Sequence, residues 1–178
     1  MLKMGTYGFV RIAMPMLSDA WRAGAWVIVA VGIVSVLYGA LVALAQTDVK
    51  RMIAFTSINH MGYVILAVGA AGIVSQDSEQ AQHLAITGAV IQMVSHGLIT
   101  GALFLLAGVF WDRTGSYDLR RYGGLASPAP RFAGFFAIAA FASLGLPGFS
   151  GFIAEFQIFT GSIGTTLWAA LALPGILI

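Results

Sequence analysis

The chain has 178 residues, of which 59% are hydrophobic and only 9% are charged, and its formal net charge is +2. A typical soluble domain is about 25% charged, so this composition excludes a soluble globular protein, which would not cover its surface with so few charges. The small net charge gives no indication of nucleic-acid binding. The sequence has no cysteine, which excludes disulfides and thiolate metal sites. The composition predicts a membrane protein.

Apolar segments long enough to cross a bilayer follow one another along the chain. A spanning helix needs about 20 mostly apolar residues, and this criterion predicts five or six segments. They cover residues 1–17, 23–45, 52–74, 84–110 and a stretch from about 130 to 178 in one or two pieces. We therefore expect an all-α, polytopic transmembrane helix bundle that forms a single membrane domain with no soluble domain.

The first segment begins in apolar sequence, and the last one stops in apolar sequence. A signal peptide is an alternative for residues 1–17, but Tyr7 and Arg11 interrupt the apolar run and no small-x-small cleavage site follows. We therefore expect the chain to be part of a longer polytopic protein. Within the span at 84–110, Gly97 and Gly101 have the small-xxx-small spacing that favours close helix packing in lipid.

The last apolar stretch contains a helix break. Pro147 lacks the backbone donor, and the glycines around it destabilise a helical turn, so residues 145–151 predict an interruption. Irregular backbone at membrane depth is tolerated only inside protein or against a watery cavity. Transporters place ion sites at such broken helices, and Glu155 follows about one turn later.

The loops differ in their positive charge. Loop 46–51 contains Lys50 and Arg51, and loop 111–130 with the start of the next segment contains four arginines, whereas loop 75–83 has neither lysine nor arginine. By the positive-inside rule, loops 46–51 and 111–130 are expected to be cytoplasmic and loop 75–83 external.

Four ionisable residues lie well inside apolar runs: Lys3, His60, His96 and Glu155. An ionisable side chain at the bilayer centre costs roughly 3 kcal/mol on insertion scales. At 1.5 Å per residue, His60 lies about 15 Å from Lys50 and His96 lies near mid-depth, while Lys3 is about 21 Å from the end of its segment. These residues therefore indicate a functional layer near the middle of the membrane.

Both histidines belong to polar stripes with helical spacing. These are Thr56, Asn59, His60 and Tyr63 in one segment, and Gln92, Ser95, His96 and Thr100 in the next. Such stripes avoid lipid, and histidine gives and takes protons near neutral pH. Simpler interpretations remain for each residue: a histidine as an interhelical hydrogen-bonding partner, Lys3 reaching toward a membrane surface, and Glu155 in a structural ion pair.

The sequence resembles the antiporter-like subunits of respiratory complex I over essentially its whole length. The motifs that carry this resemblance are residues 2–8 (LKMGTYG), 46–54 (QTDVKRMIA), 57–62 (SINHMG), 95–98 (SHGL), 145–148 (GLPG) and 151–156 (GFIAEF). Among these paralogues it is most similar to the one with glutamate at the Glu155 position, where sister subunits more often have lysine.

The resemblance implies a fourteen-helix subunit of which this chain holds about helices eight to thirteen. Lys3 matches the central-axis lysine, His60 and His96 the bridging histidines, and Glu155 the terminal residue of the half-channel toward the neighbouring subunit. The implied function is proton translocation driven by NADH oxidation and quinone reduction, through a Lys/His/Glu relay, in the bacterial inner membrane.

The resemblance also implies partners and cofactors. The partners are other membrane subunits, including neighbouring antiporter-like subunits, together with the lipid bilayer and protons. NADH, FMN, iron–sulfur clusters and quinone belong to other subunits, and no cofactor or metal is expected in this chain. A subunit of a multi-subunit sodium/proton antiporter or of a membrane-bound hydrogenase is the alternative, and a purely structural membrane subunit is a second one.

Overall fold

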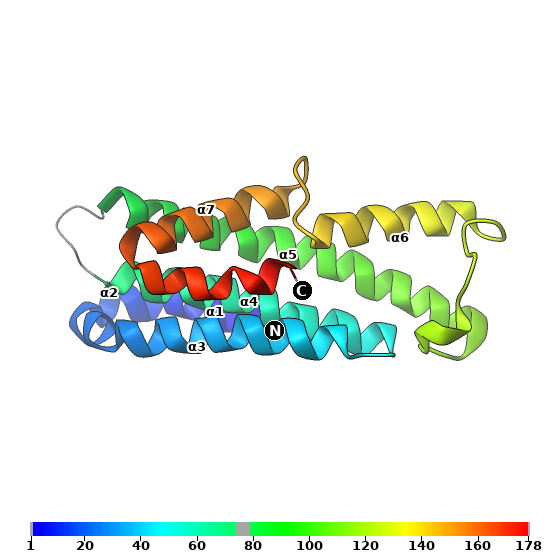
Figure 1. Cartoon of the computed structure of the whole chain (residues 1–178), viewed down its shortest axis with the longest axis horizontal. Coiled ribbons are helices and arrows are strands. Elements are labelled where there is room, and N and C mark those ends of the chain that lie inside the picture. The colour runs from blue at the N-terminus through cyan, green and yellow to red at the C-terminus, as the bar shows by residue number, and fades with distance from the viewer. Residues whose placement is uncertain (1, 74–78, 178) are drawn as a thin grey trace.

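The computed structural model describes residues 2–73 and 79–177, and the backbone in these ranges is almost entirely helical (Figure 1). The elements are α1 (Leu2–Gly8), the π-helix η1 (Phe9–Ala13), α2 (Met14–Met16), α3 (Ser18–Leu44), α4 (Val49–Gly72), α5 (Glu79–Thr114), the 3-10 helix η2 (Leu119–Arg121), α6 (Pro130–Ser143), α7 (Ser150–Thr165), the 3-10 helix η3 (Leu167–Ala172) and α8 (Pro174–Leu177). The expected all-α helix bundle is confirmed.

Three long helices form the body of the bundle. Helices α3, α4 and α5 have 27, 24 and 36 residues, and each is long and apolar enough to cross a membrane. At 1.5 Å per residue they extend over about 36–54 Å, which exceeds the about 30 Å of a hydrocarbon core. They confirm the three central spans that the sequence predicts.

The helix ends differ from the predicted ones because helical backbone continues past the apolar residues. Helix α5 begins at Glu79 rather than 84, so residues 79–83 of the expected external loop are helical, while 74–78 lie outside the described residues. The same helix continues to Thr114, and Gly115, with φ of +64°, follows it. Glutamate, glutamine and arginine are good helix formers, so the polar ends extend the helix.

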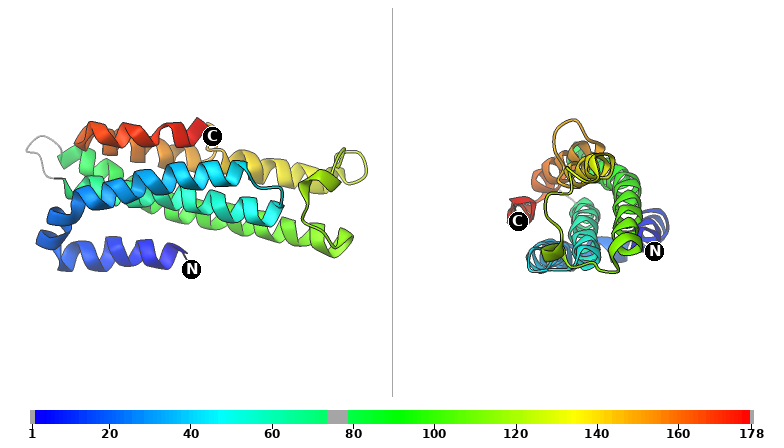
Figure 2. Two further views of the ribbon diagram at one scale, coloured as in Figure 1. Left: turned by 60° about the horizontal axis from the view of Figure 1, so that its bottom comes forward. Right: turned by 90° about the vertical axis from the view of Figure 1, so that its right-hand side faces the viewer.

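Helix α4 is the central helix. It packs against α3, α5 and α7. In its apolar stretch of 18 residues 67% is buried, compared with 33% in the corresponding stretch of α3 and 39% in that of α5. Figure 2 shows the bundle end-on, with α4 lying between α3 and the α5–α7 pair. Asn59, His60 and Tyr63, in the middle of α4, are therefore covered by neighbouring helices.

Glycines set the closest helix contacts. A Cβ at Gly39 would lie 2.6 Å from the backbone nitrogen of Asn59, and one at Gly69 would lie 2.7 Å from that of Val29, so α3 and α4 touch backbone to backbone. At Gly101, by contrast, a Cβ would meet nothing within 4 Å. Among the described residues, therefore, no helix backbone closely approaches Gly97 or Gly101, and only the Lys3 side chain lies near Gly97.

The predicted helix break separates α6 from α7 (Figure 1). The backbone leaves the helix at Leu144, and Gly145 and Gly148 take φ values of +62° and +105°, which side-chain-bearing residues rarely adopt. Helix α7 already begins at Ser150, so the irregular stretch ends slightly before residue 151. The remaining chain turns back as η3 and α8 along α3.

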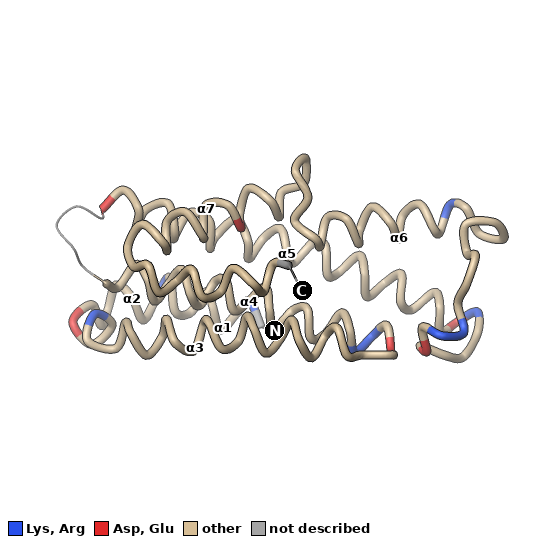
Figure 3. Tube along the Cα trace, viewed as in Figure 1, with Lys and Arg blue, Asp and Glu red and all other residues tan. Residues whose placement is uncertain are grey.

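Most lysine and arginine residues gather at one end of the bundle, where α4 begins and α5 ends (Figure 3). Here the two loops pair through their backbones: the Val49 amide donates to the Tyr117 carbonyl at 3.0 Å, and the Leu119 amide donates to the Thr47 carbonyl at 2.9 Å. In the second loop, hydrogen bonds from Arg120 lower the pKa of the exposed Asp118 carboxyl. The charged groups thus lie outside the apolar body of the bundle.

Candidate functional site

The four ionisable residues singled out in the sequence come from four different helices. Lys3 lies on α1, His60 on α4, His96 on α5 and Glu155 on α7. His60 and Glu155 are each 7% exposed and His96 is 3% exposed, whereas Lys3 is half-buried. His60, His96 and Glu155 are therefore removed from lipid and from water by the bundle itself.

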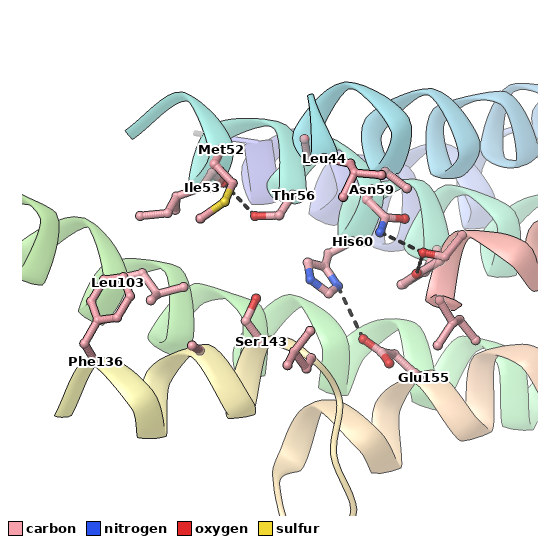
Figure 4. A pocket seen from close by; sticks show the side chains of 17 residues that line it. Leu44, Met52, Ile53, Thr56, Asn59, His60, Leu103, Phe136, Ser143 and Glu155 are labelled. Atoms are coloured by element: carbon pink, nitrogen blue, oxygen red, sulfur yellow. Dashed lines mark hydrogen bonds and ion pairs between the residues drawn. The ribbon is translucent and has the colours of Figure 1, made fainter. Parts of the chain in front are cut away.

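His60 and Glu155 are in direct contact. The Nδ1 atom of His60 lies 3.3 Å from Oε1 of Glu155 (Figure 4). A third group, the side-chain amide of Gln92 on α5, places Nε2 3.2 Å from the same Nδ1 atom. Helices α4, α5 and α7 thus meet at one imidazole nitrogen, and a proton can pass between His60 and Glu155 without an intermediate group.

His96 lies beside His60. The two ring centroids are 5.0 Å apart with an interplanar angle of 48°. Neither ring nitrogen of His96 has a hydrogen-bond partner among the described residues, although both are buried. The rings are close enough for a small rotation or one bridging water to connect them, but they do not hydrogen-bond directly.

Lys3 reaches the site only indirectly. Its Nζ donates to Oγ1 of Thr100 at 3.2 Å, and this hydroxyl donates to the backbone carbonyl of His96 at 2.5 Å. A Cβ at Gly97 would lie 3.9 Å from Cε of Lys3, so the lysine stem lies along α5 next to His96. The structure therefore brings three of the four residues into one contact chain and places Lys3 one helical turn away from it.

The helix break positions Glu155. The carboxylate packs against the backbone of Gly145, so closely that a Cβ there would overlap Oε2. The first residue of α7, Ser150, forms a hydrogen bond of 2.7 Å with Ser95 on α5, next to His96. A left-handed glycine and a serine pair therefore fix the start of α7 and direct its glutamate toward His60.

A cavity of about 300 Å³ lies against the His60–Glu155 pair (Figure 4). Its polar lining comes from Thr56, Asn59, His60, Tyr63, Ser143 and Glu155, and the rest of its wall is apolar. A second cavity of about 10 Å³ separates the pair from His96. The site therefore has one roomy and one narrow space next to its ionisable groups.

The polar stripe of α4 has two functions in the structure. Asn59 and Tyr63 line the cavity, but both also donate to the backbone carbonyl of Gly175, at 3.2 and 3.1 Å. Thr56 donates back to the carbonyl of Ile53 at 2.9 Å. Asn59 and Tyr63 therefore hold α8 against α4, and Thr56 bonds within α4. His60 is the member of the stripe that contacts the other ionisable groups.

Three participants were not identified as site residues from the sequence. Gln92 belongs to the predicted stripe, four residues before His96, and this helical spacing was the available signal. Ser150 and Gly145 lie in the break, and nothing in the sequence indicates which side chains they meet. Among the described residues, no group of three or more histidine, cysteine, aspartate or glutamate side chains is arranged to hold a metal ion.

Known proteins resemble the chain over its full length. Residues 1–178 match the family model described as NADH:quinone oxidoreductase/Mrp antiporter, TM. NAD(P)H-quinone oxidoreductase chain 4 from the chloroplast of Staurastrum punctulatum is 44% identical over 171 residues, covering 96% of this chain and 31% of the relative. NADH-quinone oxidoreductase subunit M of Rickettsia bellii is 41% identical over 177 residues, covering 97% of this chain and 34% of the relative.

A solved structure has the same fold. A chain of respiratory complex I from Thermus thermophilus with bound NADH superposes with a TM-score of 0.87 at 34% sequence identity, covering 97% of this chain and 35% of that chain. The chain thus spans about a third of the length of the proteins it matches. The fold that holds the four ionisable residues therefore also occurs in a chain of that solved structure.

Proposed function

Because the chain belongs to the NADH:quinone oxidoreductase and Mrp antiporter transmembrane family, we propose that it forms the proton-translocating part of a complex I membrane subunit, the counterpart of subunit M or chain 4. The names of the similar proteins support this assignment. The contact of 3.3 Å between His60 and Glu155, buried where three helices meet, is the single observation that favours proton movement over a purely structural role.

In the proposed relay, Glu155 and His60 exchange a proton directly, and His96 connects this pair to the Lys3 side of the bundle. Lys3 acts through its charge and its hydrogen bond to Thr100. Histidine suits the middle positions because its unperturbed pKa is near neutrality. Quinone reduction elsewhere in the complex supplies an electrostatic or conformational signal, which moves protons between these residues.

The proposal extends to the whole assembly. The chain corresponds to about helices eight to thirteen of a fourteen-helix subunit and packs beside other antiporter-like membrane subunits. NADH, FMN, the iron–sulfur clusters and quinone bind to other subunits. The membrane is the bacterial inner membrane, with the basic loops 46–51 and 111–130 in the cytoplasm and 75–83 outside, as the uneven distribution of lysine and arginine supports.

A second function is a subunit of a multi-subunit sodium/proton antiporter, which the family description also includes, or of a membrane-bound hydrogenase. The named relatives are oxidoreductase subunits, which supports the first proposal. Purification of the full-length protein separates the two: a complex I subunit co-purifies with flavin and iron–sulfur proteins, and an antiporter subunit does not.

The relay is tested with single substitutions in the full-length subunit within its complex. Lys3→Ala, His60→Ala, His96→Ala and Glu155→Gln should each lower NADH-driven proton translocation in vesicles by about tenfold or more, since positioned proton-transfer groups contribute about 100-fold or more. The matched control is His83→Ala, because this histidine also lies on α5 but its side chain is 80% exposed.

The complex content of each membrane preparation, measured on native gels, separates loss of transfer from loss of assembly. A structural role predicts that the variants reduce the amount of complex while the remaining complex pumps normally. Normal pumping by intact complexes in the His60, His96 and Glu155 variants would rule out the relay.

A further inference from the structure

Gln92 is buried at the centre of the site, and only one of its two hydrogen-bonding groups has a partner among the described residues. The residue is 2% exposed. Its Nε2 lies 3.2 Å from Nδ1 of His60, whereas its Oε1 is buried and has no hydrogen-bond partner among the described residues. A buried amide oxygen without a partner is costly, so a second arrangement in which this oxygen accepts a hydrogen bond would be favourable.

The partner of Gln92 has two protonation states. An amide nitrogen only donates, so in the arrangement seen here Nδ1 of His60 accepts from Gln92 and holds no proton. The contact with Glu155 at 3.3 Å is then favourable if the carboxyl is protonated, and its O–H shares the single lone pair of Nδ1 with the Gln92 amide. After proton transfer the O–H bond is broken, an N–H bond forms at Nδ1, and an ionised carboxylate faces a protonated imidazole ring.

The transferred proton reverses the direction of the hydrogen bond that His60 can form with Gln92. A protonated Nδ1 donates and no longer accepts, so the Nε2 group of Gln92 would face a second donor. Rotation of the amide by half a turn exchanges Nε2 and Oε1 with almost no change in shape. The oxygen that lacks a partner would then share the one N–H of Nδ1 with the Glu155 carboxylate, and this hydrogen bond is strengthened because its donor is charged.

We propose that Gln92 is a positioning residue whose amide rotates as the proton moves between Glu155 and His60, so that both states of the pair are stabilised. The proposal rests on the proton relay proposed above. Gln92 carries no proton itself, and it acts through His60.

The other described groups around His60 do not switch between donating to Nδ1 and accepting from it. The ring of His96 faces it from α5, at a centroid distance of 5.0 Å and without a hydrogen bond. Tyr63, on the same helix, presents its ring edge at 5.7 Å and donates its hydroxyl to Gly175. Lys3, on α1, donates its hydrogen bond to Thr100. Among the described residues, Gln92 is thus the neutral group at Nδ1 that can both donate and accept.

The test uses Gln92→Met in the full-length subunit within its complex, because methionine keeps the volume and removes both hydrogen-bonding functions. We expect NADH-driven proton translocation to fall by about tenfold, the effect of losing one hydrogen bond to a charged group. The alkaline limb of the pH profile should also move to lower pH, because without the amide oxygen protonated His60 is less stable. Gln157→Met is the matched control, since Gln157 on α7 also has a buried amide oxygen without a partner.

Gln92→Glu gives the opposite shift and keeps the test valid if the methionine variant fails to assemble. This change places a second carboxyl group beside Glu155 at Nδ1, and two carboxyl groups that share one site hold a proton to higher pH. The alkaline limb should therefore move to higher pH. Unchanged pH profiles in both variants, or losses no larger than those of Gln157→Met, would overturn the proposal for Gln92. Normal pumping by His60→Ala and Glu155→Gln would instead overturn the relay itself, so the two failures are distinguishable.

Discussion

Replacing Gly145 by alanine should uncouple Glu155 from His60. The Cβ of an alanine at this position would overlap Oε2 of Glu155, and the φ of +62° already disfavours any residue with a side chain. The overlap has two outcomes: either the carboxylate swings away and the contact of 3.3 Å to His60 is lost, or the break moves and α7 shifts with it.

The size of the effect follows from a comparison with Gly148. That residue also has a positive φ, +105°, but a Cβ there would meet nothing within 4 Å. Backbone strain of this kind costs about 1–3 kcal/mol and is common to both alanine variants. Overpacking adds about 1–3 kcal/mol, and only the Gly145 variant has this additional destabilisation.

The assay measures complex content on native gels and NADH-driven proton translocation per assembled complex. We expect Gly148→Ala to reduce content modestly and to pump normally, and Gly145→Ala to pump about tenfold or more slowly per complex. Adding Glu155→Asp to Gly145→Ala shortens the carboxylate by one methylene and should raise complex content to the level of Gly148→Ala. Equal behaviour of the two single glycine variants, in content and in pumping, would refute the steric argument.

Two further predictions concern packing around the site. Ser150→Ala removes the hydrogen bond of 2.7 Å to Ser95 and should destabilise the complex by about 1 kcal/mol, measured as a lower thermal midpoint with pumping per complex retained; an unchanged midpoint would show that this pair does not fix α7. Gly39→Ala places a Cβ 2.6 Å from the backbone nitrogen of Asn59 and should cost about 1–3 kcal/mol, seen as reduced content in the membrane. Gly101→Ala, where nothing lies within 4 Å, is the control and should leave content unchanged; equal losses would contradict the packing described for α3 and α4.

The spans and the helix break were predictable from sequence because they depend on local properties. Length and apolarity alone locate α3, α4 and α5, and Pro147 with its flanking glycines locates the interruption between α6 and α7. The helix ends were less predictable, because polar residues with good helix propensity, such as Glu79 and Arg113, extend α5 beyond its apolar part.

The partners within the site were not predictable, since they depend on which helix faces meet. The spacing of His60 and His96 along their helices predicts that each has a polar neighbourhood, but not that their rings lie 5.0 Å apart. Among the described residues, no helix backbone closely approaches Gly97 or Gly101, whereas Gly39, which the sequence analysis did not single out, makes one of the closest approaches. Tertiary packing, which the local sequence does not specify, determines which glycines lie at close helix contacts.

Infrared difference spectroscopy of the complete complex tests the central claim most directly, because a protonated carboxyl group has its own absorption band. Spectra are recorded before and after NADH-driven reduction, for the wild type and for Glu155→Gln. Proton exchange between Glu155 and His60 predicts a carboxyl band that changes on reduction, is absent in Glu155→Gln and is altered in His60→Ala. Identical carboxyl regions in the wild type and Glu155→Gln would contradict the claim.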